Sequence, residues 1–170
     1  MDKTITTAML IVISMITALL LFNIAYPAIV QGGDAMTSMA YGITDRMKSD
    51  ISIIHASAEQ TSSGWWNDGN SNGTFDVFGW VKNTGSSRII ALERIDVFFG
   101  PEGNFQRIPH QTQAGGSLPY WSAVLENGTN WDPTGTLQIT LHHQPSLDHG
   151  RYFMKVTLPN GVSSDYYLGF

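Results

Sequence analysis

The 170-residue sequence contains no cysteine, which excludes disulfide bonds, thiolate catalysis and zinc sites built on cysteine. It also lacks a basic stripe, because 9 lysines and arginines are outnumbered by 14 aspartates and glutamates and the formal net charge is -5 at pH 7. Binding to nucleic acid requires clustered positive charge that neutralises phosphates. We therefore expect no nucleic-acid partner.

The sequence has no recognisable constellation of catalytic residues. Acidic residues such as Asp96 and Glu102 are scattered, and neither a Ser–His–Asp grouping nor a phosphate-binding loop stands out. His142, His143 and His149 lie close together in the sequence. Adjacent residues of a strand point to opposite faces, however, so His142 and His143 are not expected to share a metal. We predict that the chain is not an enzyme.

Charged residues are absent from positions 4–31, and this segment is apolar on every side of a helix. A bilayer is spanned by about 20 such residues, so the segment is long enough to cross one. A cleaved secretory signal fits poorly, because residues 1–3 carry no net positive charge and no small-x-small site follows. Pro27 is expected to kink the helix or to mark a turn, since it frees the carbonyl of Asn23.

The pattern becomes amphipathic after Gly32 and Gly33, where methionines and Ile43 recur at helical spacing. A helix that continues to about residue 49 would be about 70 Å long, which is more than a bilayer needs. Its distal part must therefore pack on neighbouring helices or on the chain's own second domain. We predict an assembly helix in residues 1–50, with contacts made by Leu10, Ile13, Ile16, Leu20, Ile24, Met36, Met39, Ile43 and Met47.

Residues 51–170 are predicted to form a domain of short β-strands. Strands are expected over 51–58, 75–82, 89–99, 120–125, 136–141, 151–158 and 162–170, with turns rich in glycine, asparagine and proline between them. Asn160 and Gly161 have the sequence preference of a two-residue type I′ hairpin. This spacing indicates an immunoglobulin-like antiparallel β-sandwich after the long hydrophobic helix, an α+β fold class.

The loop of residues 66–76 (WNDGNSNGTFD) resembles the first half of a calcium loop, with oxygen-bearing side chains at alternate positions and a glycine for the sharp bend. The bidentate glutamate that completes such a loop is missing, because Gly79 occupies its position. The alternative is a polar, glycine-rich connection between strands. No cofactor is expected apart from a calcium ion in this loop, with Asp68, Asn70, Asn72 and Asp76 as candidate ligands.

Two N-glycosylation sequons, Asn72-Gly-Thr74 and Asn127-Gly-Thr129, fall in predicted loops. Either asparagine could carry a glycan on a surface protein. A glycan on Asn72 would compete with calcium binding by the same side chain. The two hypotheses are therefore partly exclusive at Asn72.

Tryptophan is abundant, with five residues that are expected mainly in the core of the β-domain. An exposed pair at Trp65 and Trp66 could instead anchor an interface. A carbohydrate-binding surface domain is a further alternative, and it predicts exposed coplanar aromatic rings. Its candidate residues are Trp65, Trp66 and Trp121.

Several strings of sequence resemble archaellum proteins. They are VKNTG at 81–85, IDVFFG at 95–100, GRYFMKV at 150–156 and PNGVS at 159–163, and they accompany the apolar N-terminal helix. The archaellum group includes archaellin, the filament subunit, and the related archaellar F and G proteins of the motor's stator. The resemblance implies a pilin-like N-terminal hydrophobic helix followed by a β-sandwich.

The resemblance also implies a function in assembly. In archaellins the helices bundle in the filament core, the β-domains lie outside, and a membrane motor rotates the filament to drive swimming. We favour such a structural subunit, a homo-oligomer through its N-terminal helices that is membrane-inserted before assembly, contacts the archaellum motor platform and ends in an extracellular filament at the cell surface. The alternative is a membrane-anchored archaellum stator protein, similar to the F and G proteins, whose β-domain contacts the cell envelope.

Two features of the N-terminus bear on this choice. Archaellins are made with a short basic leader, and none stands before Asp2, so the filament hypothesis expects a mature sequence and an initiator Met1 would favour the stator. Ile5 occupies the position at which type IV pilins carry a glutamate, which suits an archaellin.

Overall fold

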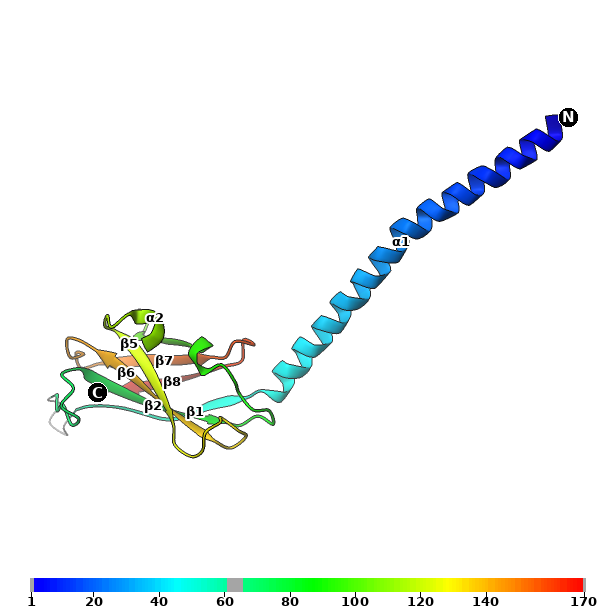
Figure 1. The fold of residues 1–170 in the computed structure, drawn as a ribbon. Coiled ribbons are helices and arrows are strands. Elements are labelled where there is room, and N and C mark those ends of the chain that lie inside the picture. Colours follow the sequence, from blue (N-terminus) through cyan, green and yellow to red (C-terminus); the bar gives the residue numbers. More distant parts are fainter. Residues whose placement is uncertain (1, 61–65, 170) are drawn as a thin grey trace. The chain divides into compact units, whose positions relative to one another are not determined.

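The computed structural model describes residues 2–60 and 66–169. The chain divides after Ile43 into two compact units. Helix α1 (Asp2–Lys48) supplies the first unit, and its last turn belongs to the second unit together with all the β-strands. The two units are described separately below (Figure 1).

Helix α1 is 47 residues long and continues through Pro27, Gly32 and Gly33. None of its described residues is buried by the rest of the chain. By length and composition it is the one helix of the described chain that is long and apolar enough to cross a membrane. Its hydroxyl groups bond to backbone carbonyls one turn earlier in the same helix, and the donors are Thr6, Thr7, Ser14, Thr17, Thr37 and Ser38. The helix therefore satisfies these polar groups internally, as a segment in hydrocarbon must.

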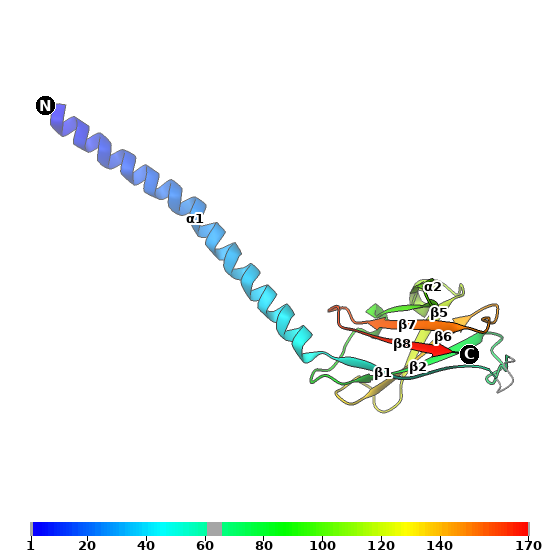
Figure 2. The ribbon, with the colours of Figure 1, turned by 180° about the vertical axis from the view of Figure 1, so that it is seen from behind.

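The second unit is a sandwich of two four-stranded antiparallel sheets (Figure 2). The first sheet has the strand order β1–β2–β6–β5 and the second has β4–β3–β7–β8. A short 3₁₀ helix η1 and a one-turn helix α2 lie in the connections. The bounds are β1 Ile51–Ala58, β2 Phe75–Asn83, η1 Leu92–Arg94, β3 Asp96–Pro101, β4 Gln106–Ile108, α2 Gln111–Ala114, β5 Tyr120–Leu125, β6 Thr136–His143, β7 Arg151–Thr157 and β8 Ser163–Gly169.

The core of the sandwich comes from alternate residues of both sheets, as the two-residue period of strands requires. Val77 and Val81 of β2 lie in the same buried cluster as Met154 and Val156 of β7. Gly79 makes room in this layer, because a Cβ there would lie only 2.7 Å from the sulfur of Met154. Burial of this apolar surface is the main force that holds the two sheets together.

The predicted fold class, a long hydrophobic helix followed by an antiparallel β-sandwich, is confirmed. The strand expected over 89–99 is interrupted, because Ala91 adopts a left-handed conformation (φ 58°) and η1 follows it. Only Ile89 of its first part pairs, as an isolated bridge to Trp131. The very short β4 was not predicted. Residue 170, the end of the last predicted strand, lies outside the described residues.

The hairpin between β7 and β8 is confirmed, but its predicted turn type is wrong. The amide of Gly161 donates to the carbonyl of Leu158, so the four-residue turn begins at Leu158 and has Pro159 at its first central position. Gly161 has a positive φ of 84°, whereas Asn160 does not, and a type I′ turn requires both central residues to be positive. The geometry is that of a three-residue loop, a type I turn followed by a left-handed glycine.

Candidate functional site

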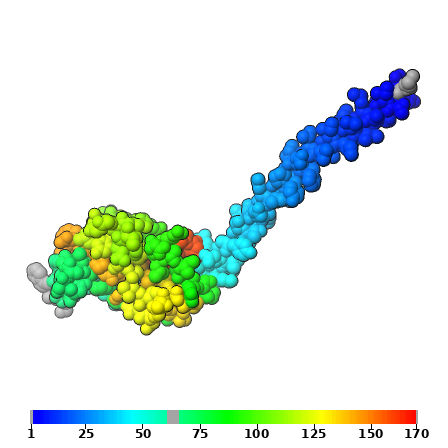
Figure 3. All heavy atoms as spheres, in the orientation of Figure 1, coloured from blue at the N-terminus to red at the C-terminus, as the bar shows by residue number. Residues whose placement is uncertain are grey.

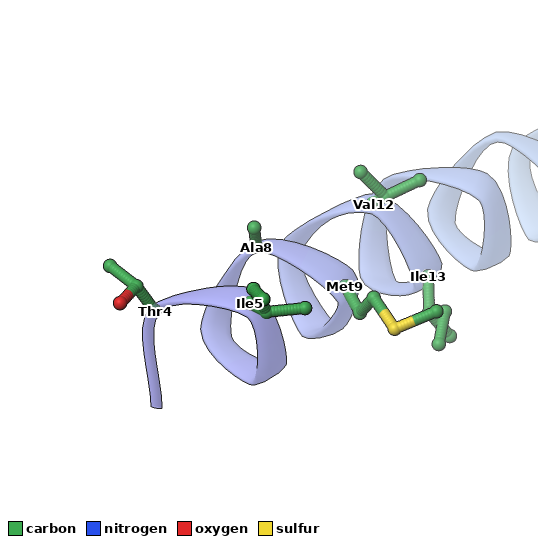
Figure 4. A pocket seen from close by; sticks show the side chains of 6 residues that line it. All are labelled: Thr4, Ile5, Ala8, Met9, Val12 and Ile13. Atoms are coloured by element: carbon green, nitrogen blue, oxygen red, sulfur yellow. The ribbon is translucent and has the colours of Figure 1, made fainter. Parts of the chain in front are cut away.

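The surface of α1 is the first functional feature of the chain. All nine predicted assembly residues are more than half exposed, from Ile16 at 53% to Met47 at 83%. Figure 4 shows the side chains near the start of the helix that line an open apolar hollow, in which the small Ala8 lies close to the larger Met9. Hollows of this kind accept the side chains of another helix. The helix therefore offers an apolar surface that lipid or other helices must cover.

The second feature is a clamp that joins the end of α1 to the β-domain, formed by residues 45–50, the loop 83–87 and the hairpin tip at 160–161. Ser86 and Ser87 donate their amides to the carbonyl of Lys48, at 2.8 and 3.2 Å. Thr84 and Gly85 donate theirs to the carbonyl of Asp50, both at 3.0 Å. The carbonyl of Lys48, the last helical residue, is thus capped by the β-domain, and the carbonyl of Asp50 just beyond the helix is satisfied in the same way.

The tip of the β7–β8 hairpin forms the other side of the clamp. Nδ2 of Asn160 donates to Oγ of the buried Ser49 at 2.8 Å and to Oδ2 of Asp45 at 3.1 Å. The guanidinium of Arg46 lies beside Gly161, about 3.6 Å from where a Cβ would stand. The hairpin tip therefore contacts the last turn of the helix and is hydrogen-bonded to it.

Asn83 lies inside the β-domain and holds the loop 83–87 of the clamp in place by hydrogen bonds. Its side chain is fully buried, donates to the carbonyls of Ser87 and Trp131, and accepts the amide of Gly85. Gly85 must be a glycine here, because a Cβ would lie 2.5 Å from both the Lys48 carbonyl and the Asp50 amide. The strings VKNTG and PNGVS, which carried the sequence resemblance, are therefore the two sides of this clamp.

The predicted calcium residues do come together, as a polar loop around the fully buried Asp76. Asn70 and Asn72 both direct their amide nitrogens to Oδ2 of Asp76, at 2.9 Å. Asp68 instead accepts the backbone amides of Asn72 and Gly73. Within residues 2–60 and 66–169, no group of three acidic or histidine side chains is arranged to hold a metal. Calcium binding stays a prediction, which a thermal melt with and without calcium tests.

Asp76 also reaches across the sheet to His142, which the sequence did not suggest. Nδ1 of His142 lies 2.8 Å from Oδ1 of Asp76, and its Nε2 lies 3.0 Å from Oγ of Ser122. The register of β2, β6 and β5 creates this group, because Asp76 pairs with His142, which in turn pairs with Tyr120. A Ser–His–Asp grouping is thus present, contrary to our interpretation of the sequence. Its members lie on regular strands, where they link the polar loop to the sheet.

Glu59 lies next to this polar loop at the end of β1. Burial raises the pKa of Glu59 above its usual value, and the nearby charges of Asp76 and Asp68 raise it further, while backbone amides that donate to it lower it. The loop therefore gathers three carboxylates, Glu59, Asp68 and Asp76, in a small volume.

The remaining predicted site residues take different positions. Trp121 is buried in the core, so the coplanar exposed set that a carbohydrate-binding domain would need is not formed with it. Trp66 is 41% exposed, and Trp65 lies outside the described residues.

Asn127 stands in the exposed connection between β5 and β6. His143 points away from His142 and bonds to the carbonyl of Pro145, as expected for neighbours on a strand.

Known proteins resemble the chain in sequence and in fold. No family model matches the sequence. An uncharacterized protein of Archaeoglobus fulgidus is 22% identical over 175 residues, which cover 99% of this chain and 98% of that protein.

Three solved structures share the fold. The archaellum periplasmic stator protein FlaG from Sulfolobus acidocaldarius matches with a TM-score of 0.55 and 23% identity, over 71% of this chain and 99% of that chain. A chain of the FlaF–FlaG stator complex of the same organism matches with a TM-score of 0.53 and 22% identity, over 70% of this chain and 88% of that chain. The archaeal flagellin FlaB1 from Methanocaldococcus jannaschii matches with a TM-score of 0.51 and 8% identity, over 71% of this chain and 89% of that chain. The chain thus has the fold that archaellum stator proteins share with archaeal flagellin.

Proposed function

We propose that the chain is an archaellum component of the stator type, held in the membrane by α1 with its β-domain outside. The observation that carries this proposal is the match to FlaG, which extends over 99% of that stator chain at 23% identity, against 8% identity for the flagellin. The match concerns the fold, and the role in the archaellum is our inference from it.

The physical features of α1 support a membrane anchor. Residues 4–31 carry no charge, and the helix satisfies its own hydroxyl groups, so the segment can remain in hydrocarbon. The clamp supports a role in transmitting force, because six backbone and side-chain groups of the loop 83–87 donate hydrogen bonds to Lys48 and Asp50 at the end of the helix.

The partners of this proposed stator would be other archaellum proteins. The FlaF–FlaG complex supports a second stator-type protein as one partner. Copies of the chain itself are another, since the exposed stripe of Met36, Met39 and Ile43 extends beyond the length that a bilayer covers. The motor platform in the membrane would be the third.

A filament subunit is the second candidate. It is favoured by one observation, the exposure of apolar side chains all around α1, because a filament core would cover every face of the helix. In that case the helix would leave the membrane on assembly, and the chain would belong to an extracellular filament.

Cell fractionation separates the two candidates. Cells that produce the chain are sheared to release their filaments, and the chain is quantified by mass spectrometry in the filament and membrane fractions. The stator proposal expects the chain in the membrane fraction, resistant to carbonate extraction and absent from the sheared filaments. The filament candidate expects it as a main constituent of the filaments, and that result would refute the stator proposal.

A further inference from the structure

The two N-glycosylation sequons differ in what their side chains already do in the folded domain. Both have the sequence Asn-Gly-Thr, so their sequences do not distinguish them. An acceptor asparagine must present its amide nitrogen to a transferase and to a large sugar donor. Structure therefore decides which of the two asparagines remains available.

Asn72 is held at both ends of its amide. Its Nδ2 donates to Oδ2 of the buried Asp76 at 2.9 Å, while its Oδ1 accepts the backbone amide and the hydroxyl of Thr74. The hydroxyl of Thr74, the third residue of the sequon, also lies 2.8 Å from Oδ1 of Asp76. A transferase would have to draw Nδ2 away from the buried carboxylate of Asp76, and Oδ1 away from Thr74, before it could attach a sugar, so modification of Asn72 requires the polar loop to open.

The side chain of Asn127 differs from that of Asn72 in its hydrogen bonding. Asn127 lies in the exposed connection 126–130, and no hydrogen bond to its side chain is formed by the described residues. Gly128, the next residue, is also exposed and has a positive φ of 104°, which glycine adopts without strain. The preceding residue is fixed to the sheet, because Glu126 donates its amide to Thr136 and accepts the indole nitrogen of Trp80. Asn127 therefore follows directly after a residue that is hydrogen-bonded to the sheet.

The surroundings of Asn127 leave room for a sugar. The segment between β5 and β6, yellow in Figure 3, forms part of the surface of the β-domain. A hollow of about 300 Å³ lies beside the connection and is lined by Thr129, Asn130 and the apolar residues Ile89, Ile90 and Leu125. Ile90 is 73% exposed. The apolar face of a sugar ring at Asn127 would have this surface to pack against.

We propose that Asn127, and not Asn72, carries an N-linked glycan. This proposal rests on the proposed position of the β-domain outside the cell. The donor is an oligosaccharide linked through phosphate to a membrane lipid. Nδ2 of Asn127 forms a bond to the anomeric carbon, and the bond from that carbon to the lipid phosphate oxygen breaks. The lipid phosphate leaves with the electron pair and accepts the proton that Nδ2 loses.

The experiment uses the full chain with a C-terminal epitope tag, produced in an archaeal host that N-glycosylates its own surface proteins. Glycopeptide mass spectrometry reports the occupancy of both sequons. The variants are Asn127→Gln, Asn72→Gln, Thr129→Ala, which destroys the second sequon, and Thr129→Ser, which keeps it. We expect the glycan mass in the wild type, in Asn72→Gln and in Thr129→Ser, and its complete loss in Asn127→Gln and Thr129→Ala.

A glycan on Asn72 in the wild-type chain would overturn the proposal. So would an unmodified wild-type chain in cells whose own surface glycoproteins are modified. Antibody binding to the tag on intact cells reports separately whether the β-domain is outside. An outside domain with a bare Asn127 refutes this proposal alone, whereas a domain that antibodies reach only after cell lysis refutes the proposed function as well.

Discussion

At the scale of single residues, the side-chain amides of two asparagines connect separate segments of the chain by hydrogen bonds. Asn83 and Asn160 each bond to several groups from different parts of the sequence. An amide can both donate and accept, so one such side chain satisfies orphan groups of two kinds. Both residues are recognisable as turn formers in the sequence, but their partners are not, such as Trp131 for Asn83 and Asp45 for Asn160.

The first prediction concerns Asn160 at the hairpin tip. Asn160→Ala removes the donor to Ser49 and Asp45 and the acceptor of the Val162 amide. We expect a loss of about 1–2 kcal/mol in the free energy of unfolding of the β-domain, because Oγ of the buried Ser49 no longer accepts a hydrogen bond, although it still donates to the carbonyl of Asp45. Urea denaturation of the full chain in detergent, followed by tryptophan fluorescence, measures it, since all five tryptophans lie beyond residue 60.

A matched control for this variant is Asn130→Ala. Asn130 is exposed, and its amide bonds only to the neighbouring Thr129. We expect a change within about 0.5 kcal/mol for the control. Equal losses in the two variants would contradict the role of Asn160 in the clamp.

The second prediction concerns Glu59, whose pKa is raised chiefly by burial and then by the charges of Asp76 and Asp68. The folded state therefore holds the Glu59 proton more tightly than the unfolded state, and this stabilisation, complete below the usual pKa of 4.5, is lost as the pH rises through the raised value. At pH 7 the ionised side chain destabilises the fold. Glu59→Gln should unfold at higher urea concentration than the wild type at pH 7.

The higher stability of Glu59→Gln should disappear below pH 4.5, because the wild-type carboxyl is then protonated and is as uncharged as the glutamine side chain. Glu93→Gln, an exposed glutamate on η1, serves as the control and should change stability little at either pH. A Glu59→Gln variant that is no more stable than the wild type at pH 7 would show that the carboxylates of the loop are not crowded as described.

The polar loop also marks a limit of sequence reasoning. The pattern around Asp68 and Asp76 predicted that these residues gather, and they do. The link from Asp76 to His142 depends on the register of β2 against β6, 66 residues apart in the chain. A single sequence contains no signal for that register, so this part of the site became known only from the structure.

At the scale of elements, α1 combines a helix that can stay in lipid with a surface that can bind other helices. Asn23 differs from the hydroxyl residues of the apolar run, because its side-chain amide has no hydrogen-bond partner among the described residues. Pro27 additionally removes the donor that the carbonyl of Asn23 would otherwise receive. Polar groups in hydrocarbon seek partners, and an amide pairs well with the same amide of a second copy.

The third prediction therefore concerns self-association of α1. Asn23→Leu should weaken association of the full chain in lipid bilayers by about 1 kcal/mol, or roughly fivefold in the dissociation constant, because the interhelical hydrogen bonds are lost. Energy transfer between labelled copies in vesicles measures it. Asn23→Gln keeps the amide and should retain most of the association, and an unchanged constant in Asn23→Leu would contradict this role.

The elements themselves were largely predictable from the sequence. Periodicity and turn residues identified α1 and most strands to within a residue or two, because a long apolar run without charges indicates a helix and alternating apolar positions indicate strands. The interruption at Ala91 was missed, since an alanine in a left-handed conformation has no sequence signature. Pro159 decided the type of the β7–β8 turn, where the Asn-Gly pair alone suggested another.

At the scale of the whole molecule, the chain consists of a long apolar helix followed by a β-sandwich. The resemblance strings in the sequence indicated the archaellum group, and the fold agrees with its stator and flagellin structures. The two candidate functions, a stator protein and a filament subunit, place the chain differently in the cell. The difference lies in where the helix resides in the cell.

The residence of the helix can be measured directly, because the chain has no cysteine and single cysteines can be introduced. Ile16→Cys reports on the apolar run and Ser163→Cys on the exposed start of β8. After filaments are sheared off, a membrane-impermeant maleimide is applied to the cell bodies. We predict that Ser163→Cys is labelled on intact cell bodies, whereas Ile16→Cys stays unlabelled until detergent dissolves the membrane. Recovery of both cysteines in the sheared filaments, with none left in the cell bodies, would contradict the account.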